Sequence, residues 1–526
     1  MSLAPQFTIV GTATLASRVT GFFRDILIAA ILGSGPVADV YVAAFLLPNL
    51  FRKMMSEGAL NASIVPRLAR LEQEGGQQAA RGFSDDVLSL LCVVVIVLVA
   101  VAELAMPQIM SVLAYGFRAD TEKFADAVLF GRIAFPFVGF VLVVAFMSAL
   151  LNAVERYAIA ALVPLVLNVI MIGVLVALIV AVPVGKRDAG LVLVSAVLAA
   201  GLIQLLLLWR SAGRAGFDLR PKLHDAVTGR VDPQAKMLLL LAIPGMIIAG
   251  SGHVHMIIAS QFASLEPHAI AWLYYADRLF QLPLGFVASS VGVVLLPRIS
   301  RALHQGDKTA MAMAQSEAFV FASLLIFPAT VALFVLAKPI TAILFQRGAF
   351  AAQDAQATAA FLRLLALALP AFVLIKVILP TFLAREEMRT PLVAVGIAIA
   401  ANILGAFVFR DIDRTLAPAA GVVIGAWTNA IVLVFAVRGR MSIVPRTYWR
   451  VFAAALAAGV MGFLIGWLAL ELKPRLSASL PFYEKGSFLL LICLAGLIVY
   501  AVMARVLGAF TFAGLGLGLG RQKQAG

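Results

Sequence analysis

The sequence is poor in charged residues and in cysteine. Only 13% of its 526 residues are Asp, Glu, Lys or Arg, whereas 62% are hydrophobic. A soluble globular domain is usually about half apolar and about a quarter charged, so this composition excludes that class and indicates a polytopic membrane protein. The two cysteines, Cys92 and Cys493, both lie in apolar runs, which excludes a disulfide framework.

Signals of several soluble activities are missing as well. The chain has no glycine-rich nucleotide loop and no polar stretch large enough for a catalytic domain. The formal net charge of +14 would suggest nucleic acid in a soluble protein, but basic cytoplasmic loops explain it here, so no nucleic-acid partner is expected. The N-terminus lacks the basic region and cleavage site of a signal peptide, which predicts that the first apolar run is a retained helix.

Apolar runs long enough to cross a membrane recur along the whole chain. A spanning helix needs roughly 20 mostly apolar residues, and such runs predict an all-α polytopic membrane protein with about fourteen transmembrane helices. The predicted spans are 7–33, 37–55, 85–112, 125–152, 158–182, 189–211, 237–262, 270–297, 313–337, 356–383, 391–409, 417–437, 450–471 and 487–510. Charges interrupt the second and the eighth.

Positively charged residues gather in one set of the connecting loops, and the alternate loops are short or balanced in charge. The basic set includes Arg67 and Arg70 after the second span, Arg220 and Lys222 after the sixth, Arg298 and Arg301 after the eighth, and Arg438 and Arg440 after the twelfth. The positive-inside rule places this set in the cytoplasm. With an even number of helices, both termini are then expected to be cytoplasmic.

An internal repeat joins the two halves of the chain. The segments "ASIVPRLARLEQEGG" and "GVVLLPRISRALHQGD" lie about 230 residues apart, and other landmarks, such as Pro48 and Pro283, recur at a similar shift. A repeat of six helices predicts two parallel lobes, related by an axis along the membrane normal, as in transporters. We expect an N-lobe over 1–222, a C-lobe over 223–440, and two extra helices with a C-terminal tail over 441–526. Both prolines are expected to break their helices.

Charged residues stand inside several predicted spans, where each costs several kcal/mol unless it faces protein or water. The first span carries Arg18, Arg24 and Asp25 in "SRVTGFFRDILIAAILG". If that helix begins near residue 7, Arg18 lies about 16 Å deep, close to the middle of the bilayer. Other charges in or beside the spans are Asp39, Arg52, Glu57, Asp277, Arg278 and Lys376.

The surplus of cations inside the membrane predicts an anionic substrate. Arginine suits phosphate in particular, because its planar fork binds two oxygens at once. The candidate substrate-binding residues are Arg18, Arg24, Arg278, Arg52 and Asp39. The candidates for gating or structural charge pairs are Asp25, Glu57, Asp277 and Lys376. For Arg52, extension of the side chain to the membrane interface is an equal alternative.

Three stretches carry a family signature. "SRVTGFFRD", "ADVYVAAFLLPNLFRKMMSEGALNASIVP" and "WLYYADRLFQLPLGFV" closely resemble the MurJ (MviN) family of bacterial lipid II flippases, and the resemblance covers essentially the whole chain. That family belongs to the MOP exporter superfamily, whose members are built of two six-helix lobes. The resemblance implies movement of lipid II, the undecaprenyl-pyrophosphate-linked disaccharide-pentapeptide, from the inner to the outer leaflet of the bacterial inner membrane.

The resemblance also implies roles for individual residues. Arg18, Arg24 and Arg278 match the central-cavity arginines of the family, and Asp39 and Arg52 match further functional charged positions. Asp25 and Glu57 match positions in the same motifs whose roles are left open. The two extra C-terminal helices resemble those that form a hydrophobic groove for the lipid tail.

By the same resemblance, transport proceeds by alternating access. No cofactor or metal is expected. An inside-negative membrane potential would favour outward movement of negative charge by about 2.3 kcal/mol per charge per 100 mV, and the coupling ion is left open. The implied partners are lipid II and membrane lipids, with the cell-wall synthesis machinery as a further candidate.

Rival functions are less consistent with the residues. The related alternatives are an exporter of another polyprenyl-pyrophosphate-linked glycan and a multidrug-type antiporter, but an exporter of cations should have an acidic cavity. A membrane enzyme would need a reactive or metal-binding group. Short motifs that suggest one are Asp85-Asp86, Asp411 with Asp413, and His253 with His255. The first suits a helix start, the second lies beside arginines, and the two histidines point in opposite directions on a helix. A scaffold would not explain arginines at the centre of the bilayer.

Overall fold

The computed structural model describes residues 3–56, 59–180, 184–305, 307–385, 387–437, 450–457, 459–461 and 482–508. Throughout these ranges the regular secondary structure is helical, which confirms the all-α prediction. Glu57, the basic residues Arg438 and Arg440, and half of the thirteenth predicted span lie outside the described residues.

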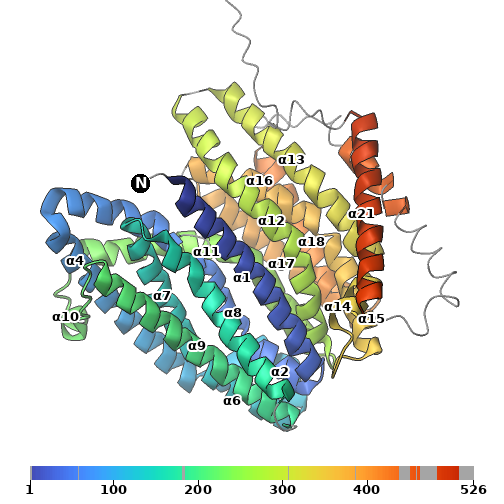
Figure 1. The fold of residues 1–526 in the computed structure, drawn as a ribbon, viewed down its shortest axis with the longest axis horizontal. Coiled ribbons are helices and arrows are strands. Elements are labelled where there is room, and N and C mark those ends of the chain that lie inside the picture. The colour runs from blue at the N-terminus through green and yellow to red at the C-terminus, as the bar shows by residue number, and fades with distance from the viewer. Residues whose placement is uncertain are drawn as a thin grey trace, which may run out of the picture. The chain divides into compact units, whose positions relative to one another are not determined.

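The chain divides into two compact units, coloured by residue number in Figure 1. Unit 1 comprises Met1–Ala271 and Arg347–Ala351. Its helices are α1 (Leu3–Leu32), α2 (Pro36–Ala44), α3 (Leu46–Ser56), α4 (Ala59–Leu104), α5 (Met106–Leu113), the 3₁₀ helix η1 (Tyr115–Ala119), α6 (Thr121–Ala134), α7 (Pro136–Ala153), α8 (Tyr157–Val180), α9 (Lys186–Arg214), α10 (Leu223–Thr228) and α11 (Pro233–Ala263). α11 packs against α3 and α4 and therefore belongs to unit 1. The two lobes expected from the repeat, with a boundary after residue 222, stay a prediction.

Unit 2 comprises Trp272–Gln346 and Ala352–Gly526. Its helices are α12 (Ala269–His304), which begins at the end of unit 1, α13 (Lys308–Val335), α14 (Ala337–Phe345), α15 (Ala352–Ala366), α16 (Leu369–Ala384), α17 (Arg389–Arg410), α18 (Ala417–Ala436), a short apolar helix over Arg450–Met461, and α21 (Phe482–Val506). The helices α17 and α18 pack closely against each other, since Gly405 and Gly421 allow the two backbones to approach.

Many of these helices suit a membrane. Within the described residues, eight are long and apolar enough to cross one, and α15 with α16, bent by 41°, would make a ninth. Large apolar side chains such as Val176, Leu206 and Val408 are exposed on α8, α9 and α17. A soluble monomer rarely exposes so much apolar surface, so these faces are suited to lipid. The count of fourteen spans stays a prediction.

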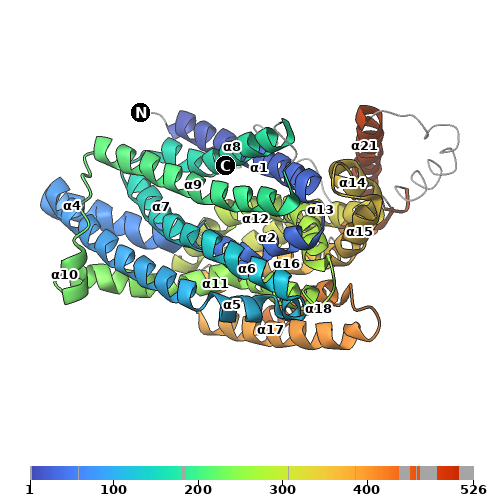
Figure 2. The same ribbon diagram turned by 90° about the horizontal axis from the view of Figure 1, so that it is seen from below.

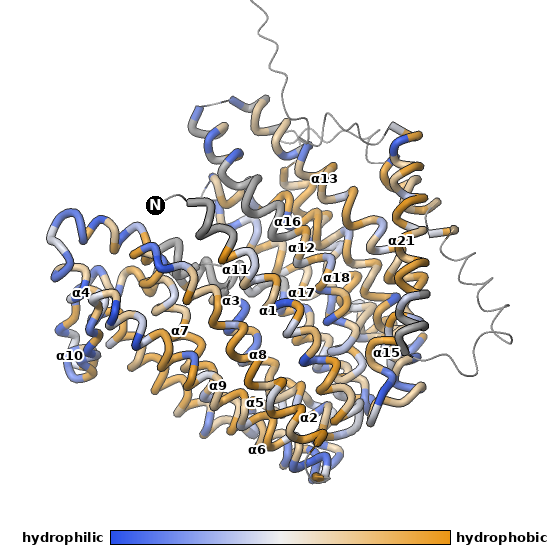
Figure 3. Tube along the Cα trace, in the orientation of Figure 1, coloured by the Kyte–Doolittle hydropathy of each residue, from blue (hydrophilic) through white to orange (hydrophobic). Residues whose placement is uncertain are grey.

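The distribution of polar residues agrees with this arrangement. Figure 3 shows apolar residues along α8 and α9, whereas hydrophilic residues gather about α10 and the first half of α4. The segment between α9 and α11 is hydrogen-bonded to α4. Asp85 Oδ1 accepts from the Arg220 amide at 2.9 Å, and Asp86 Oδ2 accepts from the Asp232 amide at 2.9 Å. The acidic pair therefore holds a connecting segment in place.

The two prolines expected to break their helices behave differently. Near Pro48 the predicted span is interrupted, because α2 ends at Ala44 and α3 begins at Leu46. Around Pro283 the prediction is wrong, since α12 runs without interruption from Ala269 to His304. A proline removes one backbone hydrogen bond, and in membrane helices neighbouring groups often compensate for that loss, so the helix can continue.

A close backbone contact fixes the end of α1. Gly33 follows α1 with φ 66°, and Gly348 lies in Arg347–Ala351 with φ 56°. The Ala349 amide donates to the Ala30 carbonyl at 2.8 Å. A Cβ atom on Gly33 would lie 2.4 Å from the Ala349 oxygen, and one on Gly348 would lie 2.3 Å from the Ala30 oxygen. We call these four residues the glycine clasp, because the contact requires glycine at both positions.

Candidate functional site

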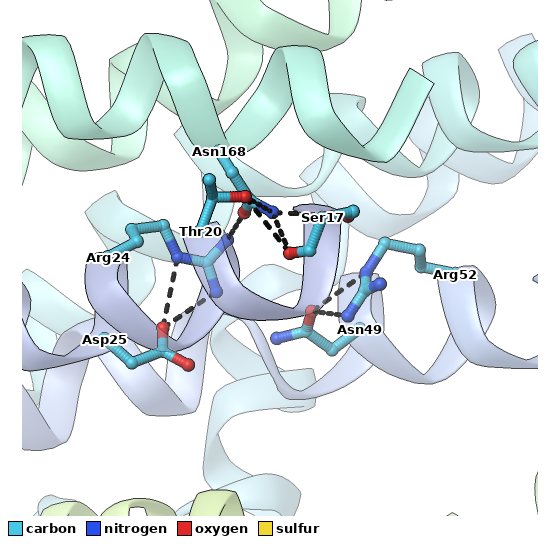
Figure 4. A network of polar contacts seen from close by, with 7 residues as sticks. All are labelled: Ser17, Thr20, Arg24, Asp25, Asn49, Arg52 and Asn168. Carbon is cyan, nitrogen blue, oxygen red and sulfur yellow. Dashed lines mark hydrogen bonds and ion pairs between the residues drawn. The ribbon is translucent and has the colours of Figure 1, made fainter. Parts of the chain in front are cut away.

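Arg24 is held in place on α1 by two partners. Its Nε and Nη2 donate to Asp25 Oδ1 at 3.1 and 2.8 Å, and its Nη1 donates to Asn168 Oδ1 at 3.0 Å (Figure 4). The Asp25 side chain is 4% exposed and that of Arg24 is 16% exposed. Hydrogen bonds to charged groups are the strong ones, and these three fix the plane of the guanidinium. This geometry supports an orienting role for Asp25.

Asn168 links the Arg24–Asp25 pair on α1 to the neighbouring helix α8. It lies on α8, which runs beside α1 and α9 in both Figure 1 and Figure 2. Its Nδ2 donates to the Ser17 carbonyl at 2.8 Å, so the amide is bound at both ends. Gly21 allows this approach, since a Cβ there would be 3.2 Å from Asn168 Nδ2. Asn168 was not among the predicted residues; a lone asparagine within an apolar run was the available signal.

The other two predicted substrate-binding arginines of unit 1 lie in different surroundings. Arg18 is exposed on α1. Arg52 is half-buried on α3, where its Nε and Nη2 lie 3.4 and 3.3 Å from Asn49 Oδ1 (Figure 4). These long contacts restrain the Arg52 side chain only weakly.

Asp39 is fully buried on α2 and has a complete set of hydrogen-bond donors. Its Oδ2 forms an ion pair with Lys123 Nζ at 2.7 Å and accepts from the His268 amide at 3.1 Å. Its Oδ1 accepts from the Ala271 amide at 3.0 Å, and His268 Nδ1 lies 2.7 Å from the Ser34 carbonyl. A carboxylate satisfied in this way favours a positioning role for Asp39 over the predicted direct contact with substrate.

An alanine at Asp39 is expected to destabilise the protein by about 3–5 kcal/mol, because it leaves the Lys123 charge buried without its partner. The melting temperature of the purified protein in detergent measures this effect. A matched control is Asp126→Ala, whose partner Arg187 is exposed, so little change is expected there. Equal melting temperatures for the two variants would contradict the positioning role.

The remaining predicted residues belong to unit 2. Arg278 lies over the Tyr274 ring, with 4.4 Å from its central carbon to the ring centroid. A guanidinium in this position gains a cation–π interaction. The neighbouring Asp277 is buried and accepts a hydrogen bond from Gln281 one turn along α12. Lys376 is half-buried on α16.

The motifs that suggested an enzyme have other partners. Asp85 and Asp86 accept backbone hydrogen bonds, and Asp413 accepts from the Leu416 amide at the start of α18. His253 Nδ1 lies 3.1 Å from Lys53 Nζ. In the part of the chain that the structure describes, no three His, Cys, Asp or Glu residues are grouped as a metal site requires.

Comparison with known proteins gives a consistent result. The family model described as "Lipid II flippase MurJ" matches residues 28–483. A probable lipid II flippase MurJ of Rhizobium meliloti (strain 1021) is 38% identical, over 99% of this chain and 96% of that protein. Among solved structures, a lipid II flippase MurJ in an inward closed conformation aligns with a TM-score of 0.77 at 20% identity, over 95% of this chain and 98% of that one. A multidrug resistance MATE family transporter of the MOP superfamily, in an inward-facing conformation, has a TM-score of 0.64 at 15% identity, over 82% and 97% of the two chains.

Proposed function

Because the chain belongs to the MurJ family of lipid II flippases, we propose that it carries lipid II from the inner to the outer leaflet of the bacterial inner membrane. The observation that carries this proposal is the guanidinium of Arg24, held by Asp25 and Asn168 in a largely apolar helix. An arginine positioned before its ligand arrives needs little reorganisation on binding. The substrate supplies a matching anion in its pyrophosphate.

The other arginines complete the proposed cavity. Arg18 and Arg52 are further cations on α1 and α3 of unit 1, and Arg278, on α12 of unit 2, is assigned the same role from the family motif in which it lies. Pyrophosphate carries several oxygens, so a group of guanidinium forks can bind it from more than one side. Asp25 and Asn168 act as positioning residues for Arg24, and Asp39 as a positioning residue for the segment that leads into α12.

Transport then follows alternating access. The head group is bound from the cytoplasmic side, the lobes rock, and the cavity opens to the periplasm. With the basic loops in the cytoplasm, both termini lie there too. The long lipid tail stays in the bilayer or against the C-terminal helices. An apolar cavity of about 210 Å³ in unit 2, with Phe327, Trp427 and Phe452 among its lining residues, supports that place for part of the tail.

A depletion-and-rescue experiment tests the proposed cavity in cells. Arg18→Ala and Arg278→Ala are each expected to lower the exposure of lipid II at the periplasmic surface severalfold, because each removes a charge-assisted contact. Arg70→Ala is the matched control, since Arg70 is exposed on α4 and paired with Glu74. Normal exposure with both variants, at normal expression, would remove the support for an anion-binding cavity.

A further inference from the structure

The apolar helices α15 and α16 of unit 2 are joined by a sharp break. α15 ends at Ala366 and α16 begins at Leu369, and the two are bent by 41°. Pro370, in the first turn of α16, has no amide hydrogen, so it cannot donate to a carbonyl at the end of α15. The Leu367 carbonyl, which lies in the break, accepts from Nε1 of Trp427 on α18 at 3.0 Å. A side chain of a neighbouring helix therefore stabilises the bend.

An apolar cavity lies against this break. It has a volume of about 210 Å³, and Leu367, Pro370 and Trp427 are among its lining residues. Phe327 on α13 and Phe452 on the short apolar helix before α21 line it as well. Trp427 therefore belongs to both features, because its Nε1 holds the break while the residue lines the cavity. A cavity with such a lining suits a hydrocarbon chain better than water.

The helix α15 connects the break to the glycine clasp. It directly follows the turn Arg347–Ala351, in which the Ala349 amide donates to the Ala30 carbonyl. In its first turn, Asp354 accepts from Trp272 Nε1 at 3.1 Å. Because α15 is about 22 Å long, a change of about 10° in the bend moves its far end by about 4 Å. No hydrogen bond tolerates such a displacement, so a change in the bend is transmitted to the contacts at the start of α15.

We propose that the break between α15 and α16 is a hinge whose bend depends on an apolar chain in the cavity, with Trp427 as the positioning residue that links the two. A chain in the cavity packs against the indole ring and keeps Nε1 on the Leu367 carbonyl, which stabilises the bend. A ligand that favours one bend shifts the population towards it, and α15 then couples the chain to the glycine clasp. This inference rests on the proposed function, since the chain is the prenyl tail of lipid II.

Two variants separate the hinge from the cavity. Trp427→Phe keeps an aromatic ring in the lining but removes the Nε1 donor, so it should bind the tail and transmit little of its effect. Leu456→Trp adds bulk to another lining residue, which is 55% exposed, and should exclude the tail while the hydrogen bond stays. Trp209→Phe, at an exposed tryptophan on α9 of unit 1, is the matched control. Melting temperatures of all variants check their folding.

The bend is measured as the distance between spin labels at Gln356 on α15 and Ile431 on α18, which are both exposed, with Cys92 and Cys493 replaced by alanine. Undecaprenyl pyrophosphate, added to the protein in nanodiscs, should shift this distance by a few ångströms. Inorganic pyrophosphate, which has no tail, should not. The shift should fall about fivefold in Trp427→Phe, as expected for the loss of one hydrogen bond, while the affinity for undecaprenyl pyrophosphate changes little. It should be largely lost in Leu456→Trp and unchanged in Trp209→Phe.

Three results would overturn the hinge and leave the proposed function intact. They are an unchanged shift in Trp427→Phe, an equal shift with inorganic pyrophosphate, and binding of undecaprenyl pyrophosphate without any shift. Failure of the unaltered protein to bind either lipid II or undecaprenyl pyrophosphate would contradict the proposed function itself, and the hinge with it.

Discussion

Cells that depend on an Arg24→Ala variant are expected to lose lipid II flipping almost completely. The substitution removes a guanidinium that contacts both a carboxylate, that of Asp25, and an amide, that of Asn168. Removing one member of a buried, hydrogen-bonded charge pair costs about 2–5 kcal/mol, so the rate should fall at least about thirtyfold. The measurement is the periplasmic exposure of lipid II after depletion of the native protein.

Two further variants test whether flipping needs the planar fork of the Arg24 guanidinium and not only its charge. Arg24→Lys keeps the charge but cannot contact Asp25 twice and Asn168 once, so it should also fail. Arg187→Ala is the matched control, because that arginine likewise contacts Asp126 through Nε and Nη2 but lies exposed at the start of α9. Normal flipping by Arg24→Ala, with the variant present at normal levels, would contradict the role assigned to Arg24.

Gly348→Ala is expected to reduce flipping about tenfold or more, through the glycine clasp. A methyl group at Gly348 would lie 2.3 Å from the Ala30 carbonyl oxygen, and the backbone there has a positive φ. Strain of this kind costs about 1–3 kcal/mol. The turn Arg347–Ala351 lies with unit 1 while its flanking helices α14 and α15 belong to unit 2. In the proposed alternating-access cycle, weakening this contact shifts the populations of the conformational states.

The control for this variant is Gly229→Ala. Gly229 has φ 76°, but nothing lies within 4 Å of the Cβ it would gain. It therefore carries the same backbone strain without the collision. The same exposure assay compares the two variants in cells. Similar flipping by both would mean that the clasp has no part in the transport cycle.

The residues that mark the site were readable from the sequence, but their partners were not. Charges stand out in an apolar helix, so Arg24 and Asp25 were found at once, and the motifs around them predicted a family that is confirmed. Asn168 is 144 residues from Arg24, and helix periodicity gives a face of a helix without naming the helix that packs on it. For the same reason the donors to Asp39, which come from Lys123 and from the backbone of His268 and Ala271, could not be predicted.

Some features of the backbone could likewise be predicted from the sequence, and others could not. The interruption near Pro48 was expected, but the same rule failed at Pro283, because a proline alone does not say whether surrounding groups will satisfy the freed carbonyl. The two glycines of the clasp carry no signal in one sequence. Glycine is required at both positions because the backbones of Ala30 and Ala349 lie so close, and only the fold brings these two residues together.

The account is tested most directly by flipping with purified components. Protein reconstituted into vesicles that contain lipid II should speed the appearance of lipid II in the opposite leaflet, detected by an enzyme or probe that cannot cross the membrane. Vesicles with Arg24→Ala should show only the slow rate of protein-free vesicles. If the unaltered protein gives no acceleration, or if Arg24→Ala gives the same acceleration, the claim that Arg24 and its partners carry lipid II across the membrane is wrong.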